Sequence, residues 1–207
     1  MFVLIYCLLN VLAFLERRKY TKNSYNIIDI NQMLKRFNSQ KNFFLTFVDM
    51  ERKPPIYLYT DGAASGNPGP GGYGIVLRCG KYEKELSGGF ACTTNNRMEL
   101  LAVILGLEQI KWDNAEVHVW SDSSYVVKAL NEGWLENWKR TGFKGKKNVD
   151  LWLRFDTVFH RHRVAFHWIK GHAGHPENER CDHLAVEAYH QPNLPDDTGY
   201  MNENKLL

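Results

Sequence analysis

The sequence is poor in cysteine and lacks the spacings that would give its cysteines a structural role. Its 207 residues include only Cys7, Cys79, Cys92 and Cys181, and none of these belongs to a C-x-x-C pair. Such a distribution argues against a zinc site or a small disulfide framework and indicates a reducing, cytoplasmic location. The sequence also has no G-x-x-x-x-G-K-[ST] segment, which excludes a P-loop nucleotidase.

A long hydrophobic run is missing as well. The most apolar stretch, residues 2–15, has 14 residues, whereas a membrane-spanning helix needs ~20. It has no preceding basic region and no small-residue cleavage site, which disfavours a signal peptide. We interpret residues 1–49 as an N-terminal extension, either disordered or a mis-assigned start before a true initiator at Met50. A helix lying on a membrane surface is the alternative. We expect a monomer without a membrane partner.

The sequence lacks a large excess of either charge, because its positive and negative residues nearly balance and the net charge is only +3. Residues 1–49 hold seven Lys and Arg against three Asp and Glu, so the rest of the chain carries −1. Global charge therefore gives no argument for nucleic-acid binding, and only a local cluster can. One such cluster is the segment KRTGFKGKK (139–147), which follows two tryptophans spaced four residues apart. Its cations and these tryptophans are Lys139, Arg140, Lys144, Lys146, Lys147, Trp134 and Trp138.

Basic and aromatic groups interleaved in this way are typical of phosphate and sugar contacts on a polynucleotide. The alternative is a solvated basic loop next to core tryptophans.

From residue 50 onward the hydrophobic pattern predicts one α/β domain, spanning residues 50–207. Strands are expected at 56–59, 74–78, 83–90, 115–121 and 163–169. Helices are expected at 95–110, 122–130 including its cap, 133–139, 149–162 and 176–189. A three-stranded antiparallel meander followed by strand–helix alternation predicts a mixed five-stranded sheet flanked by helices. Pro192, Pro195 and the sequence DDTGY predict the end of packed structure.

Four acidic residues are candidates for chemistry, although each has an ordinary explanation. Glu99 stands in a helix that is apolar nearly all round, where a carboxylate is costly unless it is paired or bound to a cation. The ordinary explanation is that Glu99 lies in the first turn of the helix, where the helix dipole favours an acidic side chain. Asp61 fits a turn, Asp122 a helix N-cap, and Asp182 the first turns of a helix.

Their joint placement favours a shared site. Two acids at the carboxyl ends of strands and two near helix starts can converge on one edge of a sheet. Oxygen ligands without cysteine suit a hard ion such as Mg²⁺ or Mn²⁺. Four carboxylates can hold two such ions ~3.5–4 Å apart, which is the geometry used for phosphodiester cleavage.

Five segments, in this order, resemble the signature blocks of bacterial type I ribonuclease H. They are YTDGAASGNPGPGGYG (59–74), TTNNRMEL (93–100), SDSSYV (121–126), KNVDLW (147–152) and KGHAGHPENERCD (170–182). The resemblance implies the ribonuclease H-like fold and a catalytic, metal-binding set of Asp61, Glu99, Asp122 and Asp182, with Asp61 bridging two ions. It also implies that His172, in a flexible loop, moves protons at the leaving oxygen. His175 is less required in the family.

The same resemblance implies an endonuclease that hydrolyses the RNA strand of RNA–DNA hybrids and leaves 5′-phosphate and 3′-hydroxyl ends. Residues 139–147 then resemble the family's basic protrusion. Amides and a hydroxyl implied to contact the hybrid are Asn67, Thr94, Asn95 and Asn96. Cys92, Ser124 and a shortened basic segment depart from the family pattern and weaken the expected grip on the hybrid. The alternatives are a catalytically silent hybrid-binding module and an integrase-like enzyme acting on DNA.

Two further patterns are interpreted as coincidental. Residues 69–74 match G-x-G-x-x-G, but the sequence that follows predicts a strand, whereas a dinucleotide site requires a helix there. Histidines at 160–162 and 172–175 lack a second ligand pair at a zinc-binding spacing.

Overall fold

The computed structural model describes residues 53–205, so the predicted N-terminal extension (1–49) lies outside the described residues. Within residues 53–205, no helix combines the length and apolar character needed to cross a membrane. The three cysteines in this part of the chain, Cys79, Cys92 and Cys181, are free thiols.

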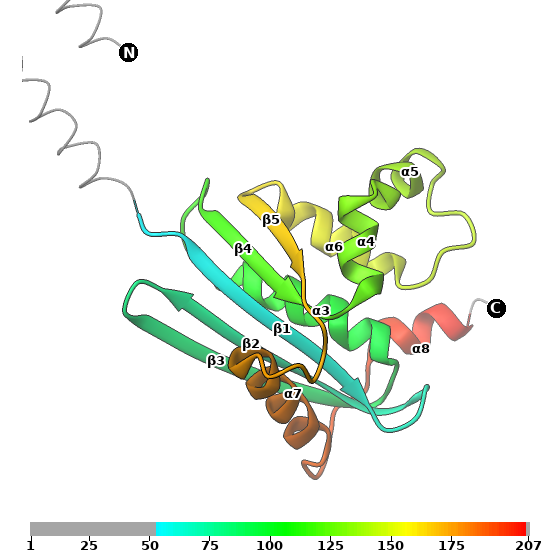
Figure 1. Cartoon of the computed structure of the whole chain (residues 1–207). Coiled ribbons are helices and arrows are strands. Elements are labelled where there is room, and N and C mark those ends of the chain that lie inside the picture. The colour runs from blue at the N-terminus through cyan, green and yellow to red at the C-terminus, as the bar shows by residue number, and fades with distance from the viewer. Residues whose placement is uncertain (1–52, 206–207) are drawn as a thin grey trace, which may run out of the picture. The chain divides into compact units, whose positions relative to one another are not determined.

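A five-stranded mixed sheet in the order β3-β2-β1-β4-β5 forms the centre of the domain (Figure 1). β1 is antiparallel to β2 and parallel to β4, and β4 is parallel to β5. The predicted meander and parallel strands are thereby confirmed. The strands are β1 (Ile56–Ala64), β2 (Gly69–Cys79), β3 (Tyr82–Thr93), β4 (Glu116–Ser121) and β5 (Arg163–Trp168).

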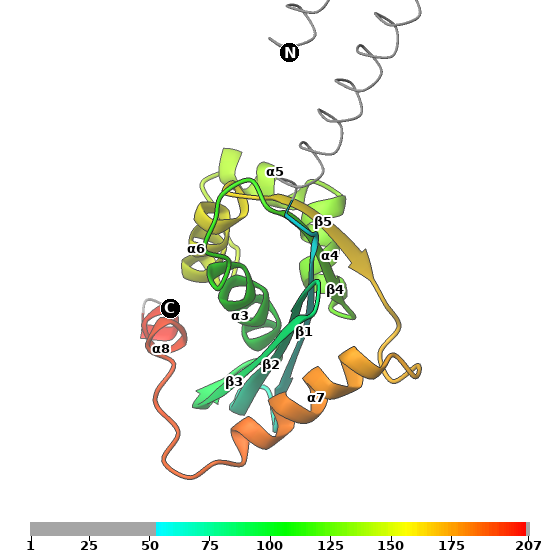
Figure 2. The same ribbon diagram turned by 90° about the vertical axis from the view of Figure 1, so that its left-hand side faces the viewer.

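Helices pack on both faces of this sheet (Figure 2). α3 packs against β1 and β2 on one face and also contacts α6, while α7 packs against β1, β2 and β3 on the other. All helices predicted between residues 95 and 189 are present. Their bounds are α3 (Asn95–Glu108), α4 (Ser124–Asn131), α5 (Trp134–Arg140), α6 (Val149–Phe159) and α7 (Pro176–Tyr189).

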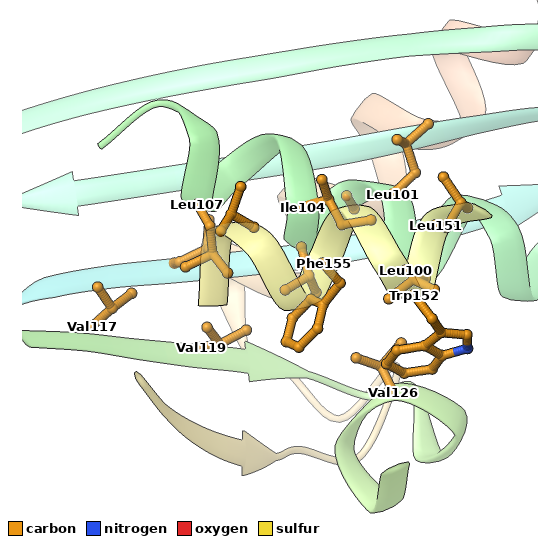
Figure 3. Packing of buried hydrophobic residues seen from close by; sticks show 14 of the residues in the cluster. Leu100, Leu101, Ile104, Leu107, Val117, Val119, Val126, Leu151, Trp152 and Phe155 are labelled. Atoms are coloured by element: carbon orange, nitrogen blue, oxygen red, sulfur yellow. The ribbon is translucent and has the colours of Figure 1, made fainter. Parts of the chain in front are cut away.

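The main hydrophobic core lies between the sheet and α3, α4 and α6 (Figure 3). β4 alternates buried and partly exposed residues, so Val119 faces the core, where Ile104 of α3 and Phe155 of α6 are also buried. Burial of each such side chain stabilises the fold by about 1.5–3 kcal/mol. α3 is buried on nearly all sides, as its sequence predicts, and this fixes the position of Glu99.

The second face is built around glycines of β2. A Cβ atom at Gly72 would overlap the carbonyl oxygen of Ala185, and one at Gly74 would overlap the carbonyl oxygen of Cys181. Only glycine therefore lets α7 lie this close to the sheet. The sequence predicted this strand only from Gly74, but β2 begins at Gly69, and its glycines position α7 and its Asp182.

The chain does not end its packed structure at Pro192, and that prediction was wrong. Asp197 is 5% exposed, and an additional helix, α8 (Thr198–Lys205), follows it. Arg97 of α3 is 2% exposed and donates hydrogen bonds to both Asp197 oxygens, at 2.8 and 2.9 Å. Its other donors reach both oxygens of Asp150, each at 2.8 Å. A buried guanidinium requires such anions, which explains why residues beyond Pro195 pack against α3.

We expect Asp197→Asn to lower the free energy of unfolding by about 3–5 kcal/mol, because it leaves part of the Arg97 charge uncompensated in the interior. Although burial opposes ionisation, bonds from Arg97, Thr93 and the Tyr200 N–H hold the pKa of Asp197 below 3.8. Its stabilising effect is thus complete above pH ~4 and is lost as the pH falls below that value.

Urea unfolding at pH 7 and pH 3 measures this effect. The matched control is Asp196→Asn, because Asp196 is the exposed neighbour and its loss should change stability by ~0.5 kcal/mol or less. Equal effects of the two substitutions would contradict a role for the Arg97–Asp197 pair.

Candidate active site

Three acidic side chains from different elements meet where the parallel part of the sheet ends. Oxygens of Asp61, Glu99 and Asp122 lie within 4.8 Å of one another. The β1–β4 ladder ends at the pair Tyr59–Trp120, and β1 then continues beside β2 alone, up to Ala64. Asp61 is therefore a strand residue and not a turn residue, and it faces the point where Asp122 follows β4.

Glu99 reaches this group because β1 and α3 lie in direct contact. A Cβ atom at Gly62 would overlap the backbone nitrogen of Glu99, so glycine is required at this approach. Asn95, one turn earlier on α3, donates from Nδ2 to Glu99 Oε1 at 3.3 Å. Glu99 Oε2 is buried without a hydrogen-bond partner. A buried carboxylate oxygen without a donor is costly in itself and fits a bound cation.

Asp122 is held by a residue that the sequence did not single out. Asn178 of α7 is 2% exposed, and its Nδ2 donates to Asp122 Oδ2 at 3.3 Å. Its own Oδ1 is buried without a partner. Gly171 lies against the Asp122 carboxylate, where a Cβ atom would crowd Oδ2. Asn178 falls within the HPENERCD block, in which nothing in the sequence distinguishes it from its polar neighbours.

The electrostatics of the group are those of crowded, desolvated acids. Burial, followed by the charges of Asp122 and Asp182, raises the pKa of Asp61 to about 8, against the opposing hydrogen bond from the Gly62 N–H. Burial and the charges of Asp61 and Asp122 raise the pKa of Glu99 well above its ordinary value. A divalent cation would reverse this situation, because it favours the charged form of every acid around it.

The remaining predicted catalytic residues lie at the margin of this group. Asp182, on α7, is half-buried and acts on Asp61 through its charge, although the three-residue group does not include it. His172 is exposed in the loop between β5 and α7, with φ of 51°. It follows Gly171, the residue that lies against Asp122.

The predicted hybrid-contacting residues 94–96 gather at the start of α3. Asn67 Oδ1 accepts a hydrogen bond from the backbone N–H of Asn95 at 3.3 Å, which ties the β1–β2 loop to this helix end. Thr94 is the N-cap of α3, but its hydroxyl makes no capping bond. The Thr93 hydroxyl donates to Asp197 Oδ2 at 2.7 Å. Asn96 is exposed beside them.

The basic segment presents its predicted side chains unequally. Trp138 is 8% exposed and packs edge-on against Trp152 at 5.3 Å, so it belongs mainly to the core. Lys139 is bound to Asp156 at 2.9 Å and to Glu136 at 3.3 Å. Lys146 Nζ lies 5.2 Å from the centre of the Trp138 ring. The side chains that face solvent are those of Arg140, Lys144, Lys146 and Lys147, while Trp134 is half-buried.

This fold and its acidic site identify the class of protein. Residues 53–190 match the sequence profile of the family described as RNase H. The Ribonuclease H of Desulforamulus reducens is 56% identical over 145 residues, which cover 68% of this chain and 91% of that protein. The Ribonuclease H of Trichodesmium erythraeum is 49% identical over 155 residues, covering 72% of this chain and 98% of that protein.

Solved structures agree. LC9-RNase H1, described as a type 1 RNase H with the type 2 active-site motif, has a TM-score of 0.61 at 31% identity over 67% of this chain and 73% of its own. LC11-RNase H1, in a complex with an RNA/DNA hybrid, has a TM-score of 0.52 at 28% identity over 65% of this chain and 96% of its own. The chain belongs to the ribonuclease H family, is of the bacterial type, and is a nuclease. The family uses divalent metal ions.

We expect Asp61→Asn to stabilise the metal-free protein at pH 8. A carboxyl whose pKa is raised to about 8 in the folded state costs stability progressively as the pH rises from ~4 toward 8. The amide removes that cost, so the rise in Tm should be larger by several degrees at pH 8 than at pH 5. Thermal unfolding in the presence of a chelator measures the difference. A lower Tm for this variant at pH 8 would show that the Asp61 charge stabilises the fold.

Proposed function

We propose that the chain is an endonuclease that hydrolyses the RNA strand of RNA–DNA hybrids with two divalent metal ions. The observation that carries the proposal is the group of Asp61, Glu99 and Asp122, in which the first two are buried and Glu99 Oε2 has no hydrogen-bond donor. Two Mg²⁺ ions, or Mn²⁺, held there and by Asp182, would activate the attacking water and neutralise the leaving 3′-oxygen, giving 5′-phosphate and 3′-hydroxyl ends.

The chain's own residues prepare this site and move its protons. Asn95 orients Glu99, and Asn178 orients Asp122, so that ligand oxygens are fixed before substrate binds. The exposed His172 is proposed to move a proton at the leaving oxygen.

We assign selection of the RNA strand to three amide side chains at and beside the start of α3. Asn67, Asn95 and Asn96 lie beside Glu99, and Asn95 bonds both Asn67 and Glu99. Amide groups can bond 2′-hydroxyls and base edges in a minor groove without requiring a base sequence. Thr94, the N-cap of α3, is proposed to contact a phosphate of the DNA strand. The neighbouring Cys92 and Ser124 are exposed and uncharged, so they add no cation to this grip.

The basic segment is proposed to hold the DNA strand through its solvent-facing cations. The same proposal includes a monomer in the cytoplasm, a location that suits the free thiols of the described chain.

Cleavage of matched RNA–DNA, RNA–RNA and DNA–DNA duplexes with Mg²⁺ tests the function. We expect only the RNA of the hybrid to be cut. Asp61→Asn should reduce kcat at least ~10³-fold, since it removes a group that acts on the reacting centre. The control is Asp113→Asn, a surface acid whose side chain is 72% exposed and whose loss should leave kcat unchanged. Cutting of DNA duplex, or full activity in Asp61→Asn, would contradict the proposal, and binding without cleavage would indicate a silent hybrid-binding module.

We expect the double substitution Lys144→Ala, Lys147→Ala to raise KM for the hybrid several-fold with little change in kcat. Both lysines are exposed, whereas Lys139 is already paired with Asp156. Each lost phosphate contact should lower the slope of log K against log salt by about 1. KM measured between 50 and 200 mM salt gives this slope. A larger effect of Lys139→Ala than of the double substitution would contradict the assignment.

A further inference from the structure

The C-terminal segment (195–205) contacts two parts of the chain that the proposed function assigns to hybrid binding. One is the start of α3, with residues 94–96, and α8 lies beside it (Figure 1). The other is the basic segment (139–147), which leads directly into the N-cap of α6. The contacts of the C-terminal segment therefore bear on how these two binding regions are held relative to each other.

The beginning of α8 is fixed against the start of α3. Asp197 accepts hydrogen bonds from Arg97 and also from the backbone N–H of Tyr200, the latter at 3.0 Å. A Cβ atom at Gly199 would overlap Asp150 Oδ2 and Arg97 Nη2, so a side chain there would have to displace this ion pair. Glycine thus lets α8 begin directly over the buried guanidinium, and the position of α8 is tied to that of α3.

Four residues after Gly199, α8 reaches the end of the basic segment. Glu203 is half-buried, and its Oε1 accepts a hydrogen bond from the backbone N–H of Asn148 at 2.7 Å. Asn148 is 6% exposed, is the N-cap of α6 and donates from Nδ2 to the Tyr125 hydroxyl at 3.2 Å. The Glu203 carboxylate also lies near the N-terminus of α6, where the helix dipole favours a negative charge. Glu203 therefore holds the residue at which the basic segment meets α6.

The basic segment gains from a fixed end because it is a series of turns. Gly142, Phe143 and Gly145 have positive φ, at 63°, 56° and 68°, and residues 141–148 belong to neither a helix nor a strand. Its solvent-facing cations are carried by these turns. A loop that is ordered before its ligand arrives loses less conformational entropy on binding, which strengthens binding without any new contact.

We propose that Glu203 is a positioning residue for hybrid binding, which acts by holding the end of the basic segment at a fixed place relative to the start of α3. The contacts to the two strands of the hybrid are then set before the hybrid arrives. This inference rests on the proposed function and names the residue that joins its two binding regions. The charge of Glu203 by itself repels phosphate, so its charge and its hydrogen bond act on hybrid binding with opposite signs.

Kinetics of hybrid cleavage by the full chain with Mg²⁺ test the inference. We expect Glu203→Ala to raise KM about 3- to 10-fold with kcat unchanged, because one anchoring hydrogen bond is lost. Glu203→Gln keeps an acceptor oxygen and should leave KM within ~2-fold of that of the unmodified chain. The matched control is Asp196→Ala, which removes the same charge from an exposed position of the same segment and should leave KM unchanged.

An unchanged or lower KM in Glu203→Ala would overturn the inference, because only the charge of Glu203 would then matter. A rise in KM that is equal in Glu203→Ala and Glu203→Gln, or a parallel fall in kcat, would also overturn it.

Hydrogen exchange at the Asn148 amide separates this inference from the proposed function. We expect this amide to exchange about 10-fold faster in Glu203→Ala than in Asp196→Ala, since its acceptor is gone. Equal exchange rates would contradict the anchoring role even if the hybrid is cut. If the unmodified chain does not cut the hybrid, the proposed function is wrong, whatever the exchange rates are.

Discussion

The mutual repulsion of Asp61, Glu99 and Asp122 is the constraint around which the domain is arranged. Three carboxylates within 4.8 Å, two of them buried, oppose folding unless a cation joins them. The fold tolerates this arrangement because the acids come from separate parts of the rigid frame: Asp61 from β1, Glu99 from α3, which lies in the main core, and Asp122 directly after β4. Separate elements fix the oxygens before any ion arrives, which is the requirement for a preorganised metal site.

Several residues of the sequence motifs serve this arrangement without touching substrate. Gly62 lets β1 meet α3, while Gly72 and Gly74 let α7 approach the sheet with Asp182 and Asn178. Arg97, two residues before Glu99, fastens the start of α3 to Asp150 and Asp197. The site is therefore supported by close backbone contacts and one buried ionic network, and its geometry depends on the C-terminal segment as well as on the sheet.

The order and type of the elements between residues 56 and 189 follow from local patterns, because alternation, helical periodicity and turn residues act over a few positions. Contacts between residues that lie far apart in the sequence could not be predicted from such local patterns. Nothing local in DDTGY indicates that Asp197 must neutralise an arginine of α3, and Asn178 has no distinguishing neighbour in sequence. Likewise, the position of Trp138 in the sequence, next to basic residues, suggested a binding surface, whereas in the structure its ring packs on Trp152. The four acids were predicted to converge on one edge of the sheet, and the end of the β1–β4 ladder at Tyr59–Trp120 explains where Asp61 and Asp122 meet.

The central claim is that the buried carboxylates exist to bind metal. Anomalous diffraction from crystals of the protein grown with a hybrid and Mn²⁺ tests this most directly. We expect two anomalous peaks ~3.5–4 Å apart, both within bonding distance of Asp61 oxygens. A second acidic group, Glu136, Asp156 and His160, is exposed or half-buried and already holds Lys139. Peaks at that group alone, or none beside Asp61, would contradict the account.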